Sequence, residues 1–143
     1  MLARGHSRIN EVRTGGLLRV VRWLPVALWM AGVFYLSHQS APLEPVAANV
    51  NPVLAHIVVY GVLAILLYIA VAPPANVAVR WVPASIAFAL AVLYGVSDEV
   101  HQAFVPGRIA SEADVLADGA GAAIGIAMVL ITSQRLSLGP KHP

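Results

Sequence analysis

The residues best suited to chemistry lie close together in one stretch of this 143-residue chain, SDEVHQAFVPGRIASEADVLAD, which covers residues 97–118. The stretch contains five of the seven acidic residues, a histidine, a glutamine and an arginine. Carboxylates and histidine can bind a divalent ion or transfer protons. An arginine fork can hold a phosphate or carboxylate ligand, or pair with a neighbouring acid. The same residue types also occur at solvated helix ends, so the spacing alone leaves both interpretations open.

The overall composition predicts a membrane protein. Apolar residues make up 59% of the chain and charged residues 11%, and the mean hydropathy is +0.77. Soluble domains carry roughly 25% charged residues. The chain has no cysteine, which excludes disulfides, thiolate metal ligands and a cysteine nucleophile.

Four apolar stretches predict an all-α integral membrane bundle of four transmembrane helices. The expected spans are about residues 17–37, 53–72, 81–97 and 113–132, each near the roughly 17–25 residues that cross a bilayer. Asn51 and Pro52 are expected to cap and begin the second span. A membrane domain over 17–134 then lies between a basic tail at 1–16 and a short tail at 135–143. No small-residue cleavage site follows the first span, so we expect it to be retained.

The distribution of lysine and arginine predicts the orientation of the bundle. With four spans, eight of these nine residues fall on one side of the membrane, and positive charge favours the cytoplasmic side. Both termini are therefore expected in the cytoplasm, in a multi-pass protein of the cytoplasmic membrane. Arg108 is the exception, because residues 94–125 are expected to form the outer connection between the third and fourth spans. The basic tail carries no nucleic-acid-binding motif and is expected to contact anionic lipid.

Ionisable residues from different spans are expected at one depth. At 1.5 Å per helical residue, one residue of each span lies roughly 24–27 Å from the inner end of that span. These residues are His38, His56, Asp98 and Asp118. His56 and Tyr60 share one helical face, and Asp114 and Asp118 are one turn apart on another helix. Ionisable groups at this depth should face the bundle interior or a water-filled cavity instead of lipid. The sequence thus predicts an outward-facing polar site.

A stripe of small residues on the fourth span predicts close helix packing, because it includes a Gly-x-x-x-Gly pair. Its members recur every four positions and are Ala113, Ala117, Gly121 and Gly125. The stripe runs beside the two aspartates of the same helix. Ser111, three residues before Asp114, is expected to cap the start of this helix.

Three motifs carry a family resemblance. They are SDEVHQAFVPGRIASEADVLADGAGAAIG, AHIVVYGVLAILL in the second span and FYLSHQS at the end of the first. Together they resemble the VanZ-like family of membrane proteins, named for a teicoplanin-resistance protein, over about residues 23–131. The residues that match are Asp98, Glu99, Gln102, Arg108, Asp114 and Asp118 in the first motif, and His56, Tyr60 and Leu63 in the second. Many members carry Asp-Lys just before the histidine, where this chain has Pro52 and Val53, so any ionic role of that pair is absent or supplied elsewhere.

The resemblance implies a role at the cell envelope and lowered sensitivity to teicoplanin-type glycopeptides, without an established chemical mechanism. We expect the outer site to bind an envelope precursor or a glycopeptide. Its candidate residues are His56, Tyr60, Asp98, Glu99, His101, Gln102, Arg108, Asp114 and Asp118.

Two alternatives stay open at this level. One is a membrane-embedded hydrolase or transferase, with or without a metal, acting on a lipid-linked envelope substrate. The other is a structural or assembly protein whose polar cluster only holds the helices together. The residues specify no catalytic group, metal or cofactor, and a homo-oligomer in the lipid bilayer fits them as well as a monomer.

Overall fold

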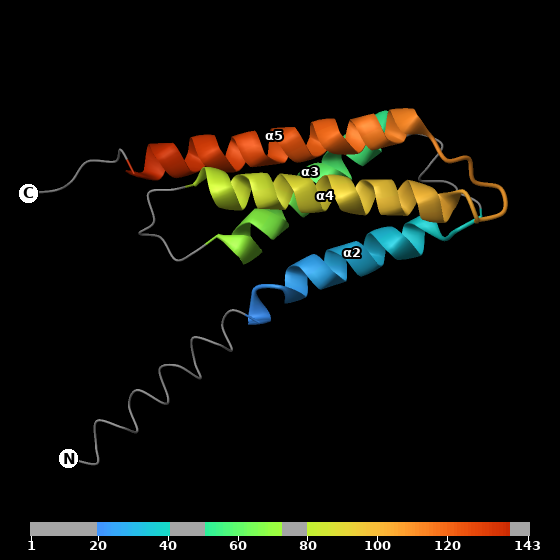
Figure 1. The fold of residues 1–143 in the computed structure, drawn as a ribbon, viewed down its shortest axis with the longest axis horizontal. Coiled ribbons are helices and arrows are strands. Elements are labelled where there is room, and N and C mark those ends of the chain that lie inside the picture. Colours follow the sequence, from blue (N-terminus) through green and yellow to red (C-terminus); the bar gives the residue numbers. More distant parts are fainter. Residues whose placement is uncertain (1–19, 41–50, 73–79, 138–143) are drawn as a thin grey trace, which may run out of the picture.

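The computed structural model describes residues 20–40, 51–72 and 80–137, and these form an all-helical, antiparallel bundle (Figure 1). Its helices are α2 (Leu24–Ser37), α3 (Pro52–Val71), α4 (Trp81–Gln102) and α5 (Glu112–Ser137). The ends of α2 and α4 and the starts of α3 and α5 meet at one end of the bundle, which we call the polar end. The predicted tail at 1–16 and residues 138–143 of the predicted C-terminal tail lie outside the described residues.

Helix α3 is the central element of the bundle. Its most extensive packing is against α5, and it also contacts α4 and α2. Tyr60, Leu63 and Ala64 are almost fully buried, because this helix has neighbours on several sides. The predicted start is confirmed: the Asn51 side chain accepts a hydrogen bond from the Leu54 amide at 3.3 Å, and Pro52 occupies the first turn.

The small residues of α5 allow that helix to pack tightly against α3. A Cβ atom added at Gly121 would collide with the backbone of Ile57, and one added at Gly125 would collide with the backbone of Gly61. The prediction of close packing is therefore confirmed for these two glycines. Ala117 is buried as expected, but Ala113 is exposed and lies outside the contact.

Three helical segments are long and apolar enough to cross a membrane: Pro52–Val71, Trp81–Gln102 and Glu112–Gln134. Helix α2 is shorter, at 14 residues. It covers about 21 Å along its axis, less than the roughly 30 Å hydrocarbon core. Pro25 sits in its first turn, and a turn at residues 22–23 separates it from the short helical piece at 20–21. Length and composition thus identify three candidate spans in the described part of the chain.

Helix α4 extends five residues past the span predicted at 81–97. Asp98, Glu99, His101 and Gln102 therefore lie on its last turns and not in a connecting loop, so that part of the prediction was wrong. Side-chain hydrogen bonds from Gln102 to the two acids one turn before it stabilise this end of the helix. The connection to α5 covers only residues 103–111, where Gly107 adopts a φ of 82°.

Candidate functional site

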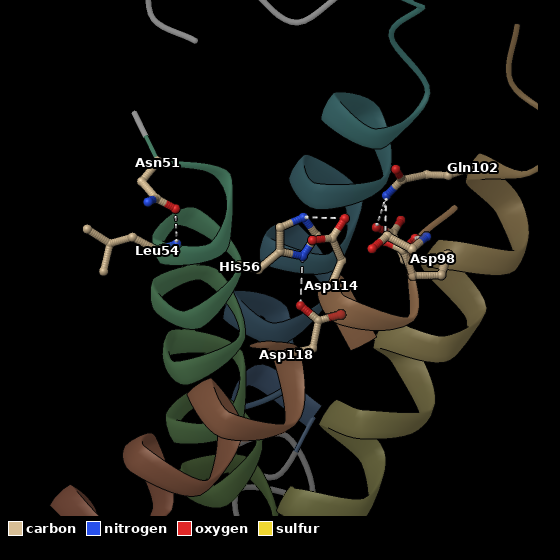
Figure 2. Close-up of polar contacts among 9 residues, drawn as sticks. Asn51, Leu54, His56, Asp98, Gln102, Asp114 and Asp118 are labelled. Atoms are coloured by element: carbon tan, nitrogen blue, oxygen red, sulfur yellow. Dashed lines mark hydrogen bonds and ion pairs between the residues drawn. The ribbon is translucent and has the colours of Figure 1, made fainter. Parts of the chain in front are cut away.

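The centre of the polar end is a hydrogen bond between α3 and α5. His56 Nδ1 lies 2.8 Å from Asp118 Oδ1, and Asp118 is only 1% exposed (Figure 2). Both residues were predicted at the same depth, and the structure brings them together. Because an isolated carboxylate is costly to bury, the histidine is the main partner that makes this position tolerable for Asp118.

Two glycines explain why these side chains meet. Gly121, one turn after Asp118, brings α5 against the backbone of Ile57, the residue next to His56. On the other side, Asp118 Oδ2 points at Gly95 of α4, where an added Cβ atom would lie 2.6 Å from it. The Asp118 carboxylate therefore occupies space that a larger residue at position 95 would fill.

Asp114 approaches the second nitrogen of the same imidazole. His56 Nε2 lies 3.9 Å from Asp114 Oδ2, and Figure 2 shows both aspartates facing the ring from successive turns of α5. This confirms that Asp114 and Asp118 share one helical stripe. If the Nδ1 proton is donated to Asp118, Nε2 is left with a lone pair that faces the Asp114 carboxylate.

The last turn of α4 contributes two further acids. Gln102 Nε2 donates to Asp98 Oδ2 at 2.9 Å and to Glu99 Oε1 at 3.2 Å, which holds the two carboxylates side by side. Asp98, Glu99 and Gln102 are all buried, with 5% exposure or less. One oxygen of Asp98 and one oxygen of Asp118 have no hydrogen-bond partner.

Glu99 also joins α4 to the start of α5. Its Oε2 accepts a hydrogen bond from the Ser111 amide at 2.8 Å. We expected the Ser111 side chain to cap α5, but no hydrogen bond joins that hydroxyl to Asp114 in the described part of the chain. An acceptor from α4 instead satisfies the amide at the helix start, as a carboxylate near a helix N-terminus does well. Sequence spacing along α5 alone could not reveal a partner from another helix.

Tyr60 lies one helical turn after His56 on the same face of α3, as predicted. The two rings are parallel, with centroids 6.3 Å apart, and Tyr60 is 1% exposed. Its hydroxyl has no hydrogen-bond partner. Tyr94 of α4, which we did not include among the candidates, packs on Tyr60 and donates to the Met30 carbonyl of α2 at 2.7 Å.

Two predicted site residues are not brought into this cluster. His101 points toward α2, where its Nε2 lies 3.3 Å from His38 Nδ1 and its ring contacts Phe34. Arg108 is half-buried in the connection before α5 and forms no ion pair with any acid that the structure describes. His38 was left out of the candidate set, although its distance from the start of its helix places it at the same depth.

The comparison with protein families agrees with the motifs. A family model described as VanZ/LLP1 matches residues 21–133. The chain belongs to the VanZ/LLP1 family. The predicted family resemblance is thereby confirmed, and the matched region contains all nine candidate site residues. Searches of curated proteins and of solved structures gave no significant match.

Within this VanZ/LLP1 chain, one group of side chains has the composition of a metal centre. His56, Glu99 and Asp114 each offer a ligand atom, and these atoms all lie within 4.8 Å of one another. The three residues come from three different helices. A histidine and two carboxylates can bind a divalent ion or exchange protons with a bound molecule.

A separate apolar groove lies between α4 and α5 at the opposite end of the bundle. Its lining includes Trp81, Phe88 and Leu130. We assign it no chemistry because it contains none of the candidate site residues, and apolar surface of this kind suits contact with lipid in a VanZ/LLP1 membrane bundle.

Proposed function

We propose that the protein crosses the cytoplasmic membrane four times, with both termini in the cytoplasm and the polar end of the bundle outside. In this arrangement residues 17–134 form the membrane domain between two cytoplasmic tails. The polar end binds a polar component of the cell envelope, a lipid-linked precursor or a glycopeptide, and thereby lowers sensitivity to teicoplanin-type glycopeptides. No nucleic acid takes part, and a homo-oligomer is compatible with the proposal.

The observation that supports this proposal best is the meeting of His56, Asp114 and Asp118 with two acids of α4 at one end of the bundle. Two other arginines lie at the opposite end, whereas Arg108 lies in the connection between α4 and α5. Arg22 donates to the Ala72 carbonyl at 2.9 Å, just after α3, and Arg80 precedes α4. Because basic residues stay in the cytoplasm more often than acids do, this asymmetry favours an outward-facing polar end.

The first test is teicoplanin and vancomycin susceptibility in a sensitive host that produces the wild type, Asp118→Ala or Asp118→Asn at matched membrane levels. We expect the wild type to raise the inhibitory concentration of teicoplanin and both variants to lose that effect. Glu112→Gln is the matched control, because Glu112 is an exposed acid in the first turn of the same helix. No change with the wild type would remove glycopeptide resistance from the proposal, at least for that host.

A second candidate function is a membrane-embedded hydrolase or transferase that acts on a lipid-linked envelope substrate. It is favoured by the His56–Asp118 pair, in which a buried carboxylate orients an imidazole whose other nitrogen faces the site. This candidate requires turnover of a lipid-linked substrate by the purified wild type, with turnover lost in His56→Gln.

A structural role is the remaining alternative, because buried hydrogen bonds between helices also hold bundles together. It differs in one measurable respect. If the polar cluster only locks the helices, Asp118→Asn should fail to accumulate in the membrane. If the cluster is a working site, the variant should accumulate and lose the susceptibility effect.

A further inference from the structure

We propose that His56, Glu99 and Asp114 bind a divalent transition-metal ion, and that Asp118 positions His56 for this role. The inference rests on the proposed function only in taking the polar end as the working site. The metal itself can be detected without any knowledge of the substrate.

The distances suit a single ion. Zinc lies about 2.0–2.2 Å from histidine nitrogen and carboxylate oxygen, so two ligand atoms on one ion are at most about 4.4 Å apart. His56 Nε2 and Asp114 Oδ2 are 3.9 Å apart, and all three ligand atoms lie within 4.8 Å of one another. A small shift of the Glu99 carboxylate would complete the trio. Hydrogen bonds from Gln102 and from the Ser111 amide hold this group in place, and its oxygens keep further lone pairs for an ion.

The hydrogen bond to Asp118 prepares His56 to be a ligand. Metal-bound histidines commonly donate their other ring N–H to a carboxylate, which fixes the tautomer and the ring orientation. Here His56 Nδ1 lies 2.8 Å from a carboxylate that is almost fully buried. The Nε2 lone pair then faces the Asp114 carboxylate, an unfavourable meeting of two acceptors unless a cation or proton lies between them.

The charge of the cluster also calls for a cation. Asp98, Glu99, Asp114 and Asp118 can carry four negative charges, and His56 can offset only one of them. No lysine or arginine pairs with these acids among the residues that the structure describes. A divalent ion would remove much of this imbalance, which is costly in a buried environment.

Unpartnered oxygens provide a second and independent observation. One oxygen of Asp98 and one of Asp118 are buried without a hydrogen bond, in residues 5% and 1% exposed. Asp98 lies beside the Glu99 ligand, because both accept from Gln102 Nε2, and Asp118 contacts the His56 ligand. Water or hydroxide on the metal would give the free oxygen of Asp98 a donor, whereas the free oxygen of Asp118 points at Gly95.

The donor set favours particular metals. Calcium and magnesium prefer oxygen ligands alone, whereas zinc, manganese and ferrous iron accept imidazole together with carboxylate. Three protein ligands leave at least one coordination position for water or for the oxygen of a bound molecule. A phosphate, sugar or peptide carbonyl oxygen could therefore bind directly to the ion.

The first experiment uses the untagged full-length protein in detergent micelles. The protein is stripped with a chelator and dialysed against Mn²⁺ or Zn²⁺, and bound metal is counted by mass spectrometry. We expect one ion per chain. Asp118→Asn, which alters the partner of the His56 ligand, should weaken metal binding roughly 10–100-fold. Asp114→Asn and Glu99→Gln, which alter the ligands themselves, should weaken it by at least as much.

Two controls separate this trio from other donors on the same chain. Glu112→Gln removes an exposed acid from the first turn of α5, and His38→Ala removes the partner of His101. Both variants should bind the ion as the wild type does. Absence of stoichiometric metal in the wild type, or equal binding by Asp114→Asn, would overturn the proposal, as would loss of binding in His38→Ala.

A spectroscopic measurement that needs none of the site variants covers the case in which those variants do not fold. Electron spin-echo spectroscopy of the Mn²⁺-loaded protein should detect one coordinated imidazole nitrogen, and His38→Ala should leave that signal unchanged. A spectrum without nitrogen coupling would reject His56 as a ligand.

The metal site and the proposed function can fail separately. Metal binding without any glycopeptide phenotype would reject the proposed function and keep the metal site. A glycopeptide phenotype without metal binding would reject the metal site alone.

Discussion

Gly121 of α5 lies directly against the backbone of Ile57 on α3, so closely that a Cβ atom at position 121 would collide with it. Ile57 is the neighbour of His56, and Gly121 is three residues from Asp118. The backbone contact thus sets the separation of the two helices at the point where the 2.8 Å His56–Asp118 hydrogen bond forms. The small-residue stripe and the polar site are two parts of one arrangement.

Replacing Gly121 by alanine should therefore destabilise the bundle. The new methyl group meets backbone atoms that cannot rotate away, and overpacking of this kind typically costs about 1–3 kcal/mol. The loss should exceed the gain of roughly 1 kcal/mol that alanine brings to a helix. Unfolding of the purified protein in mixed detergent and SDS micelles measures the difference.

Gly119→Ala is the matched control for this substitution. Gly119 lies on the same helix, and an added Cβ atom would have no neighbour within 4 Å. The variant should be at least as stable as the wild type, because only the helix-propensity gain remains. Equal stability of Gly121→Ala and Gly119→Ala would show that the α3–α5 contact is loose enough to accept a methyl group beside Ile57.

A second prediction concerns the space that Gly95 provides for Asp118. Gly95→Ala would place a Cβ atom 2.6 Å from Asp118 Oδ2, so the carboxylate must shift and its hydrogen bond to His56 is disturbed. In an Asp118→Ala background this oxygen is gone, and the same substitution should cost less. A double-mutant cycle on unfolding free energies should give a coupling of at least about 0.5 kcal/mol. Additive effects would mean that the two positions do not interact.

Gln102 is predicted to contribute to the stability of the protein as well as to hold the Asp98 and Glu99 carboxylates in place. In Gln102→Ala, the carboxylates of Asp98 and Glu99 lose their shared donor, and a buried acceptor without a partner costs about 1–3 kcal/mol. Gln102→Glu should cost more, because it adds a third carboxylate to the same turn. Val100→Ala, at an exposed position on that turn, should stay within about 0.5 kcal/mol of the wild type in the same unfolding assay.

Much of the fold could be predicted from the sequence because hydrophobic runs and helix breakers are local signals. The starts of α3 and α4 fell within one residue of the prediction, and the glycine contact followed from spacing along α5. The end of α4 was missed because charged and amide residues usually indicate a loop. In this chain Gln102 pairs with the two acids within the helix, which is a side-chain effect that composition does not report.

The site could be predicted less completely, for a physical reason. Depth along a helix follows from counting residues, so His56 and Asp118 were placed at one level. The direction of a side chain depends on how neighbouring helices are rotated, and that is not encoded in spacing. His101 was therefore grouped with His56, whereas the rotation of α4 turns it toward His38 of α2. The capping of α5 by Glu99 depends on the same rotation.

The topology of the proposed four-span bundle gives the last prediction, and the absence of cysteine in the chain makes it simple to test. Single cysteines are introduced by His6→Cys, Ile109→Cys and Pro143→Cys; Ile109 is 87% exposed in the connection between α4 and α5. A membrane-impermeant maleimide should label only Ile109→Cys in intact cells and all three variants after lysis, because the polar end faces outward and both termini are cytoplasmic. Labelling of His6→Cys without Pro143→Cys in intact cells would mean an odd number of spans and would leave α2 outside the membrane. Labelling of both termini with protection of Ile109→Cys would invert the orientation and place the polar site in the cytoplasm, which contradicts a direct role at the outer envelope.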